Sequence, residues 1–116
     1  VVKSWINGPL SEEGPLKAGM TQIHGVAFAG MQPVQGVEVS VDGGATWSRA
    51  QLIVPDLGRF AWRQFVLPVR LAPGTHVLAS RATDAAGHAQ PAEREENIRG
   101  YNNNSWRDHA VTVTVV

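Results

Sequence analysis

The residues best suited to bind a ligand lie in a loop near the C-terminal end of the chain. Arg99 precedes Gly100 there, between Asn97 and a run of three asparagines. Gly100 allows backbone conformations closed to other residues, and the amide groups around it can fix a loop through local hydrogen bonds. A guanidinium held in this way suits a tetrahedral oxyanion, because it has forked donors and a permanent charge. On these residues alone, an ordinary exposed arginine in a well-capped loop is the simpler interpretation.

The rest of the chain offers little catalytic chemistry. It has no cysteine, no serine in a Gly-x-Ser-x-Gly turn, and four histidines scattered one to a segment. None of these histidines has the spacing of a metal site. Four tryptophans could form a carbohydrate-stacking platform, although core and rim packing is the simpler interpretation: Trp5, Trp47, Trp62 and Trp106. We therefore assign no catalytic residue and no metal ligand to this chain.

Length and charge set the limits of what the chain does. Its 116 residues fit one domain over residues 1–116, and its net charge of zero provides no field for nucleic acid or an anionic membrane. The apolar runs are too short to cross a bilayer, and no signal peptide is visible. The chain begins without methionine, so we expect a C-terminal fragment of a longer protein, although a mature N-terminus would look the same.

A second motif, in residues 37–47, predicts a β-hairpin. Its spacing Ser-x-Asp-x-Gly-x-Thr-Trp is that of the Asp-box hairpin, which occurs in several unrelated β folds, and the residues are Ser40, Asp42, Gly44, Thr46 and Trp47. Asp42 is interpreted as a turn carboxylate, because it can accept hydrogen bonds from the backbone N–H groups that follow it. We interpret Trp47 as a core anchor. The motif predicts local structure and says little about function.

The remaining pattern is one of short alternating segments separated by turn residues. Such segments occupy residues 1–6, 20–29, 37–41, 48–54, 60–69, 75–83 and 109–116. Trp47 and Leu52 cannot face the same way in a regular strand, so we expect a bulge between them. In residues 20–29, Ile23, Gly25 and Ala27 share one face. These features predict an all-β fold, an immunoglobulin-like antiparallel β-sandwich of about seven strands.

The chain carries an ordered set of motifs: Ile23-x-Gly25-x-Ala27, the hairpin, Trp62 with Phe65, Arg81 to Asp84, Gln90-Pro91, Asn97-x-Arg99-Gly100, and Trp106 before the last strand. Taken in this order, the motifs resemble the C-terminal dimerisation domain of the sulfite oxidase family of molybdenum-cofactor oxidoreductases. The resemblance covers essentially the whole chain and is closer to the bacterial members, since residues 101–104 are polar.

The resemblance implies what the chain does and with which partners. It implies a homodimer formed through this domain, next to a separate domain that holds a molybdopterin-type molybdenum cofactor through a cysteine thiolate. This chain has no cysteine, so we expect no cofactor in it and no catalysis by it alone. Arg99 maps onto the arginine that reaches the substrate pocket of the cofactor domain and helps bind sulfite or a related oxyanion, supported by Asn97 and Gly100. The resemblance also allows a cytochrome electron acceptor and favours a periplasmic location.

One alternative of a different class stays open. A stand-alone β-sandwich that binds carbohydrate or protein, as a module of a secreted enzyme, would explain the four tryptophans and the hairpin. Glycan binding that is lost on Trp5→Ala or Trp106→Ala would support this alternative.

Overall fold

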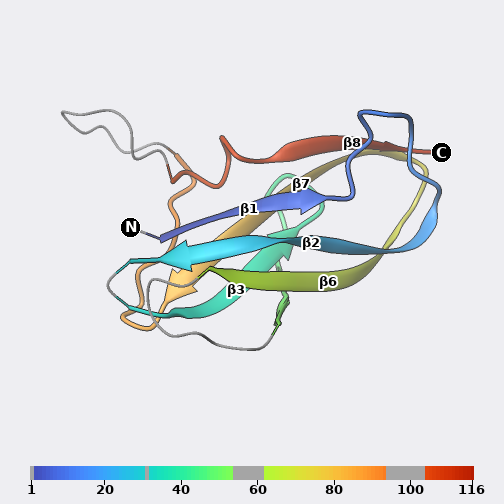
Figure 1. Cartoon of the computed structure of the whole chain (residues 1–116). Coiled ribbons are helices and arrows are strands. Elements are labelled where there is room, and N and C mark those ends of the chain that lie inside the picture. The colour runs from blue at the N-terminus through green and yellow to red at the C-terminus, as the bar shows by residue number, and fades with distance from the viewer. Residues whose placement is uncertain (1, 31, 54–61, 94–103) are drawn as a thin grey trace.

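The computed structural model describes residues 2–30, 32–53, 62–93 and 104–116, which form two antiparallel sheets of four strands (Figure 1). The first sheet has the order β1-β2-β6-β5 and the second the order β4-β3-β7-β8. The described residues contain no helix, so the predicted all-β sandwich is confirmed, with eight strands instead of about seven. The strands are β1 Val2–Gly8, β2 Gly19–Ala29, β3 Val34–Ser40, β4 Ser48–Arg49, β5 Gln51–Leu52, β6 Arg63–Leu71, β7 Gly74–Asp84 and β8 Val111–Val115.

Alternation along β2 and its neighbours fills the core from the first sheet. Ile23, Ala27 and Phe65 are fully buried, as expected for one parity of a strand with one covered face. Gly25 lies between them on the same face, where a Cβ atom would be 2.1 Å from the Trp5 carbonyl oxygen and 2.5 Å from the Phe65 ring. The predicted shared face of Ile23, Gly25 and Ala27 is confirmed, and glycine is required because two groups already occupy the space of a side chain.

The second sheet covers this core with the apolar residues of β3, β7 and β8. Val37, Val39, Leu78 and Val113 are buried, and the β8 threonines between the valines face outward. The clean alternation of β8 therefore matches the sequence prediction.

The segment after the hairpin differs from its prediction. We expected one return strand over residues 48–54 with a bulge, but the chain makes two short strands in different sheets. Ser48–Arg49 pairs with β3, whereas Gln51–Leu52 pairs with β6. Ala50 is the crossing point: it is buried, and its N–H still donates to Val37 O at 2.8 Å. The break in parity thus marks a move from one sheet to the other, not a bulge within a strand.

The two chain ends lie at opposite ends of the sandwich (Figure 1). At the C-terminal end, the connector before β2 runs beside β8, where Leu16 N donates to Thr114 O and Val116 N donates to Leu16 O. At the other end, Val2 O accepts a bond of 3.1 Å from Asn104 Nδ2. No helix long and apolar enough to cross a bilayer occurs in the described part of the chain.

Candidate functional site

The predicted oxyanion site lies outside the described residues. Arg99, Asn97 and Gly100 all belong to residues 94–103, so their predicted roles stay predictions. The structure does describe the residues on both sides of this segment. The contacts of these flanking residues, before residue 94 and after residue 103, show how they are held by the rest of the fold.

Gln90 joins the two flanks through a buried polar network. Its side chain is only 3% exposed, and its Nε2 donates to Asn104 O at 2.9 Å. Its Oε1 accepts from Ala82 N at 2.9 Å and also from Ser4 Oγ. Because the single hydroxyl proton of Ser4 goes to Gln90, the 2.8 Å contact between Ser4 and Ser80 must be a bond that Ser80 donates. One side chain thus ties the chain before and after residues 94–103 to β1 and β7.

A second pair of bonds holds the flanks together further along. Trp106 N donates to Pro91 O at 2.9 Å, and Ser105 Oγ donates to Ala92 O at 3.2 Å. Ser105 is fully buried, and Trp106 is 7% exposed. Residues 91–92 and 104–106 are therefore held together next to the start of β1.

The hairpin residues form a compact hydrogen-bonded turn. Ser40 Oγ donates to Asp42 Oδ1 at 2.7 Å and accepts from Gly44 N at 2.8 Å. Thr46 donates to Asp42 twice, from its hydroxyl at 2.6 Å and from its N–H at 2.9 Å. The Thr46 hydroxyl, then Ser40, lower the pKa of Asp42 from 3.8 to about 2. A carboxylate engaged in this way shapes a turn and is poorly placed to accept a proton near neutral pH.

The hairpin also supports the chain that follows residues 94–103. Trp47 contacts Trp106 edge to face, with ring centroids 4.9 Å apart, and the Arg81 guanidinium lies 4.1 Å from the Trp47 ring centroid. A Cβ atom at Gly44 would come within 2.3 Å of the Trp106 ring. The prediction of Trp47 as a core anchor is wrong, because Trp47 is half-buried and lies outside the core cluster. Its contacts are with Arg81 and Trp106, on the outside of the second sheet.

A second turn carboxylate, Asp84, closes the adjoining loop. Its Oδ1 accepts from Ala86 N and His88 N at 2.9 Å each, and its Oδ2 lies 3.1 Å from His88 Nδ1. Burial by itself raises the pKa of Asp84, but the bonds from His88 and Ala86 outweigh this effect and lower the pKa. Asp84 is therefore held ionised as a turn-former.

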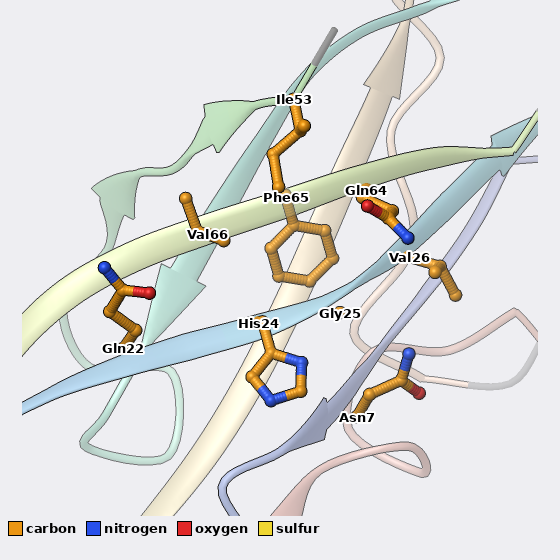
Figure 2. A pocket seen from close by; sticks show the side chains of 9 residues that line it. All are labelled: Asn7, Gln22, His24, Gly25, Val26, Ile53, Gln64, Phe65 and Val66. Atoms are coloured by element: carbon orange, nitrogen blue, oxygen red, sulfur yellow. The ribbon is translucent and has the colours of Figure 1, made fainter. Parts of the chain in front are cut away.

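The outer face of the first sheet carries a cluster that the sequence analysis did not assemble. Trp62 contacts Trp5 at 5.1 Å and Phe28 at 5.0 Å between ring centroids. Beside them is a hollow of about 270 Å³ (Figure 2), lined by Asn7, Gln22, His24, Gly25, Val26, Ile53, Gln64, Phe65 and Val66. The alternation along β2 could have predicted this cluster. Val26 and Phe28 alternate with the buried Ala27, so their side chains lie on the outer face of the sheet.

The described residues do not fit a metal cofactor. No three histidine, aspartate or glutamate side chains in this part of the chain come together as a ligand group, and the sequence has no cysteine. We assign no step of cofactor chemistry to these residues.

Comparison with known proteins gives a consistent result. The family model described as "Mo-co oxidoreductase dimerisation domain" matches residues 2–115. Over 118 aligned residues, the chain is 34% identical to a nitrate reductase (NADH) from Solanum lycopersicum and 33% identical to an inducible nitrate reductase (NADH) from Glycine max. Each match covers 90% of this chain and 13% of the relative, so the chain spans a small part of these proteins.

A solved protein structure is also similar to this chain. The sulfane dehydrogenase SoxCD from Paracoccus pantotrophus superimposes with a TM-score of 0.72 at 29% identity. The match covers 96% of this chain and 29% of that one.

Proposed function

The chain belongs to the Mo-co oxidoreductase dimerisation domain family, and from this we propose that it completes the substrate pocket and forms the dimer contact of a longer, sulfite-oxidase-type molybdenum oxidoreductase. In this proposal residues 1–116 are one domain. A second domain of the same protein holds the molybdenum cofactor. The partial coverage of the relatives, 13% and 29% of their chains, supports a longer parent protein.

The observation that carries the proposal is that the two flanks of residues 94–103 are bonded to each other. Gln90 and Ser105 bind across the two flanks, and Trp106 is packed under the hairpin. An anchored segment lets one side chain reach another domain in a fixed pose, and such positioning is what anion binding requires. We assign that role to Arg99, with Asn97 and Gly100 as loop support.

The substrate in this proposal is a small oxyanion such as sulfite. The guanidinium recognises charge and forked acceptors, which sulfite and nitrate share. The similar proteins are named as a nitrate reductase and a sulfane dehydrogenase. These names are consistent with full-length proteins that act on different small molecules. A cytochrome electron acceptor and a bacterial origin belong to the same proposal and stay predictions.

The full-length protein tests the proposal directly. We expect a dimer in sedimentation velocity, molybdenum in elemental analysis, and oxidation of sulfite with an artificial electron acceptor. Nitrate reduction in place of sulfite oxidation would change the substrate while leaving the domain assignment intact. A protein that contains no molybdenum after expression with its cofactor pathway would contradict the proposal.

The carbohydrate-binding alternative keeps one supporting observation. Trp62 is 50% exposed and contacts Trp5, whose indole N–H donates to Asn7 Oδ1 at 2.9 Å. Trp106, in contrast, is too buried to serve as a stacking platform. This alternative is therefore confined to the outer face of the first sheet, where Trp62 is exposed.

A further inference from the structure

We propose that the hollow of about 270 Å³ on the outer face of the first sheet is a binding site for a neutral saccharide (Figure 2). The inference goes beyond the proposed function, because it uses no residue of the segment around Arg99 or of its flanks. It also differs from a tryptophan platform, since the polar side chains of the hollow carry the argument.

The register of three strands brings polar side chains together at the hollow. Four of its lining residues are exposed and polar: Asn7, Gln22, His24 and Gln64. His24 lies opposite Val66, and Val26 lies opposite Gln64, so His24 and Gln64 are diagonal neighbours across β2 and β6. Diagonal neighbours are about 7–8 Å apart, which lets both side chains reach one small ligand.

Short apolar side chains form the floor of the hollow. Val26 and Val66 are half-buried and lie between the longer polar side chains (Figure 2). A small-molecule site commonly combines an apolar surface with a few polar groups that fix the orientation of the ligand. A sugar ring matches this arrangement, because its faces carry C–H groups and its rim carries hydroxyl groups.

The polar groups around the hollow are available to a ligand. Trp5 Nε1 donates to Asn7 Oδ1 at 2.9 Å, which orients the Asn7 amide and leaves its two N–H donors for a ligand. The side chains of Gln22, His24 and Gln64 make no hydrogen bond within the described part of the chain. Their donors and acceptors therefore face solvent and can bind hydroxyl groups without breaking a bond of the fold.

The charge of the lining selects a neutral ligand. None of the described residues that line the hollow is an aspartate, glutamate, lysine or arginine. A phosphate or carboxylate would need a cation here, and a cationic ligand would need a carboxylate. Amide side chains donate and accept hydrogen bonds, as each sugar hydroxyl also does. A neutral saccharide is the class of ligand that matches these groups.

The dimensions of the hollow fit one sugar unit. Strands β1 and β6 lie on opposite sides of β2, so two spacings of about 4.8 Å place the backbones of Asn7 and Gln64 about 10 Å apart. This separation is comparable to one sugar ring with a hydrogen bond on each side. A volume of about 270 Å³ is at the lower end of ligand pockets, so we expect weak binding.

The position of the hollow keeps it away from the end of the sandwich that the proposed function assigns to the cofactor domain. At that end Asn104 bonds to Val2, which pairs with Ala29 of β2. His24 is five residues from Ala29 along the same strand, or about 17 Å at about 3.3 Å per residue. Both sites can therefore be occupied at once.

Isothermal titration calorimetry of the full-length protein tests the inference. The probes are neutral pentasaccharides of glucose, mannose, galactose and N-acetylglucosamine, and we expect one of them to bind with a millimolar or lower dissociation constant. His24→Ala and Gln64→Ala should each raise this constant about 5-fold or more, as expected for the loss of a hydrogen bond. Gln35→Ala removes an exposed glutamine from the second sheet and should leave it unchanged.

The outcomes are separate from those of the proposed function. Absence of binding for all four pentasaccharides overturns the inference. Binding that persists unchanged in both His24→Ala and Gln64→Ala places the saccharide elsewhere and overturns it as well. Thermal unfolding checks that the variants are folded, which we expect because both positions are exposed. Sulfite oxidation should be the same in wild type and in both variants, whatever the calorimetry shows.

Discussion

Gln90 Nε2 donates a hydrogen bond of 2.9 Å to Asn104 O, across the two ends of the segment that contains Arg99. The same side chain accepts from Ala82 N of β7 and from Ser4 Oγ of β1. One buried amide thus connects both sheets to the flanks of residues 94–103. Loss of this amide should affect stability and substrate binding together.

Gln90→Leu keeps the approximate size of the side chain and removes its polar atoms. Ala82 N–H and Asn104 C=O then lose a buried partner, which costs about 1–3 kcal/mol for each group left unsatisfied. We expect urea denaturation to show a loss of about 2–4 kcal/mol, allowing for partial relaxation. Gln22→Leu, at an exposed position of β2, is the control and should change stability by less than about 0.5 kcal/mol. Equal effects of the two variants would contradict the bridging role.

Gly44→Ala tests the support that the hairpin gives to Trp106. Gly44 has φ +99, and the added Cβ would lie 2.3 Å from the indole ring. Gly87 has a similar φ of +89 with nothing within 4 Å, so Gly87→Ala reports the backbone strain alone. We expect a cost of about 1 kcal/mol for Gly87→Ala and at least about 1 kcal/mol more for Gly44→Ala. Thermal unfolding measures both, and identical melting temperatures would show that Trp106 moves away freely.

The low pKa of Asp42 predicts a loss of stability in acid. Its folded pKa of about 2 lies below the ordinary 3.8, because Thr46 and Ser40 donate to the ionised form. The contribution is therefore fully present above about pH 4 and is lost as the pH falls toward 2. Asp42→Asn should be less stable than wild type at pH 7, and the difference should shrink between pH 4 and 2. Carboxyl NMR gives the direct check, and a midpoint near 4 for Asp42 in the folded protein would refute the prediction.

Much of the fold could be predicted because its signals are local. The alternation of β8 and the shared face of Ile23 and Ala27 follow from the period of a strand, which any half-buried sheet imposes. The crossing at Ala50 could not be predicted. The break in alternation after Trp47 indicates only that the strand is interrupted. That residues 51–52 then pair with β6 depends on contacts between residues far apart in the sequence.

The contacts around the candidate site could likewise be predicted only where they are local in the sequence. The hairpin bonds of Ser40, Asp42 and Thr46 join residues at most four positions apart, so their spacing was informative. Gln90 and Ser4 are 86 residues apart, and neither residue type signals burial by itself. Likewise, Trp5 and Trp62 meet only because β1 and β6 both pair with β2.

The steady-state kinetics of Arg99→Ala in the full-length enzyme test the central claim most directly. Removal of a charge-assisted contact of about 1.5–3 kcal/mol should raise the KM for the oxyanion about 10- to 100-fold, with molybdenum content unchanged. Arg99→Lys should restore only part of the lost affinity for the oxyanion, because lysine keeps the positive charge but lacks the forked donors of the guanidinium. Arg107→Ala removes an exposed arginine near the same end of the sandwich and should leave KM at the wild-type value. An unchanged KM in Arg99→Ala would contradict the claim that this domain completes the substrate pocket.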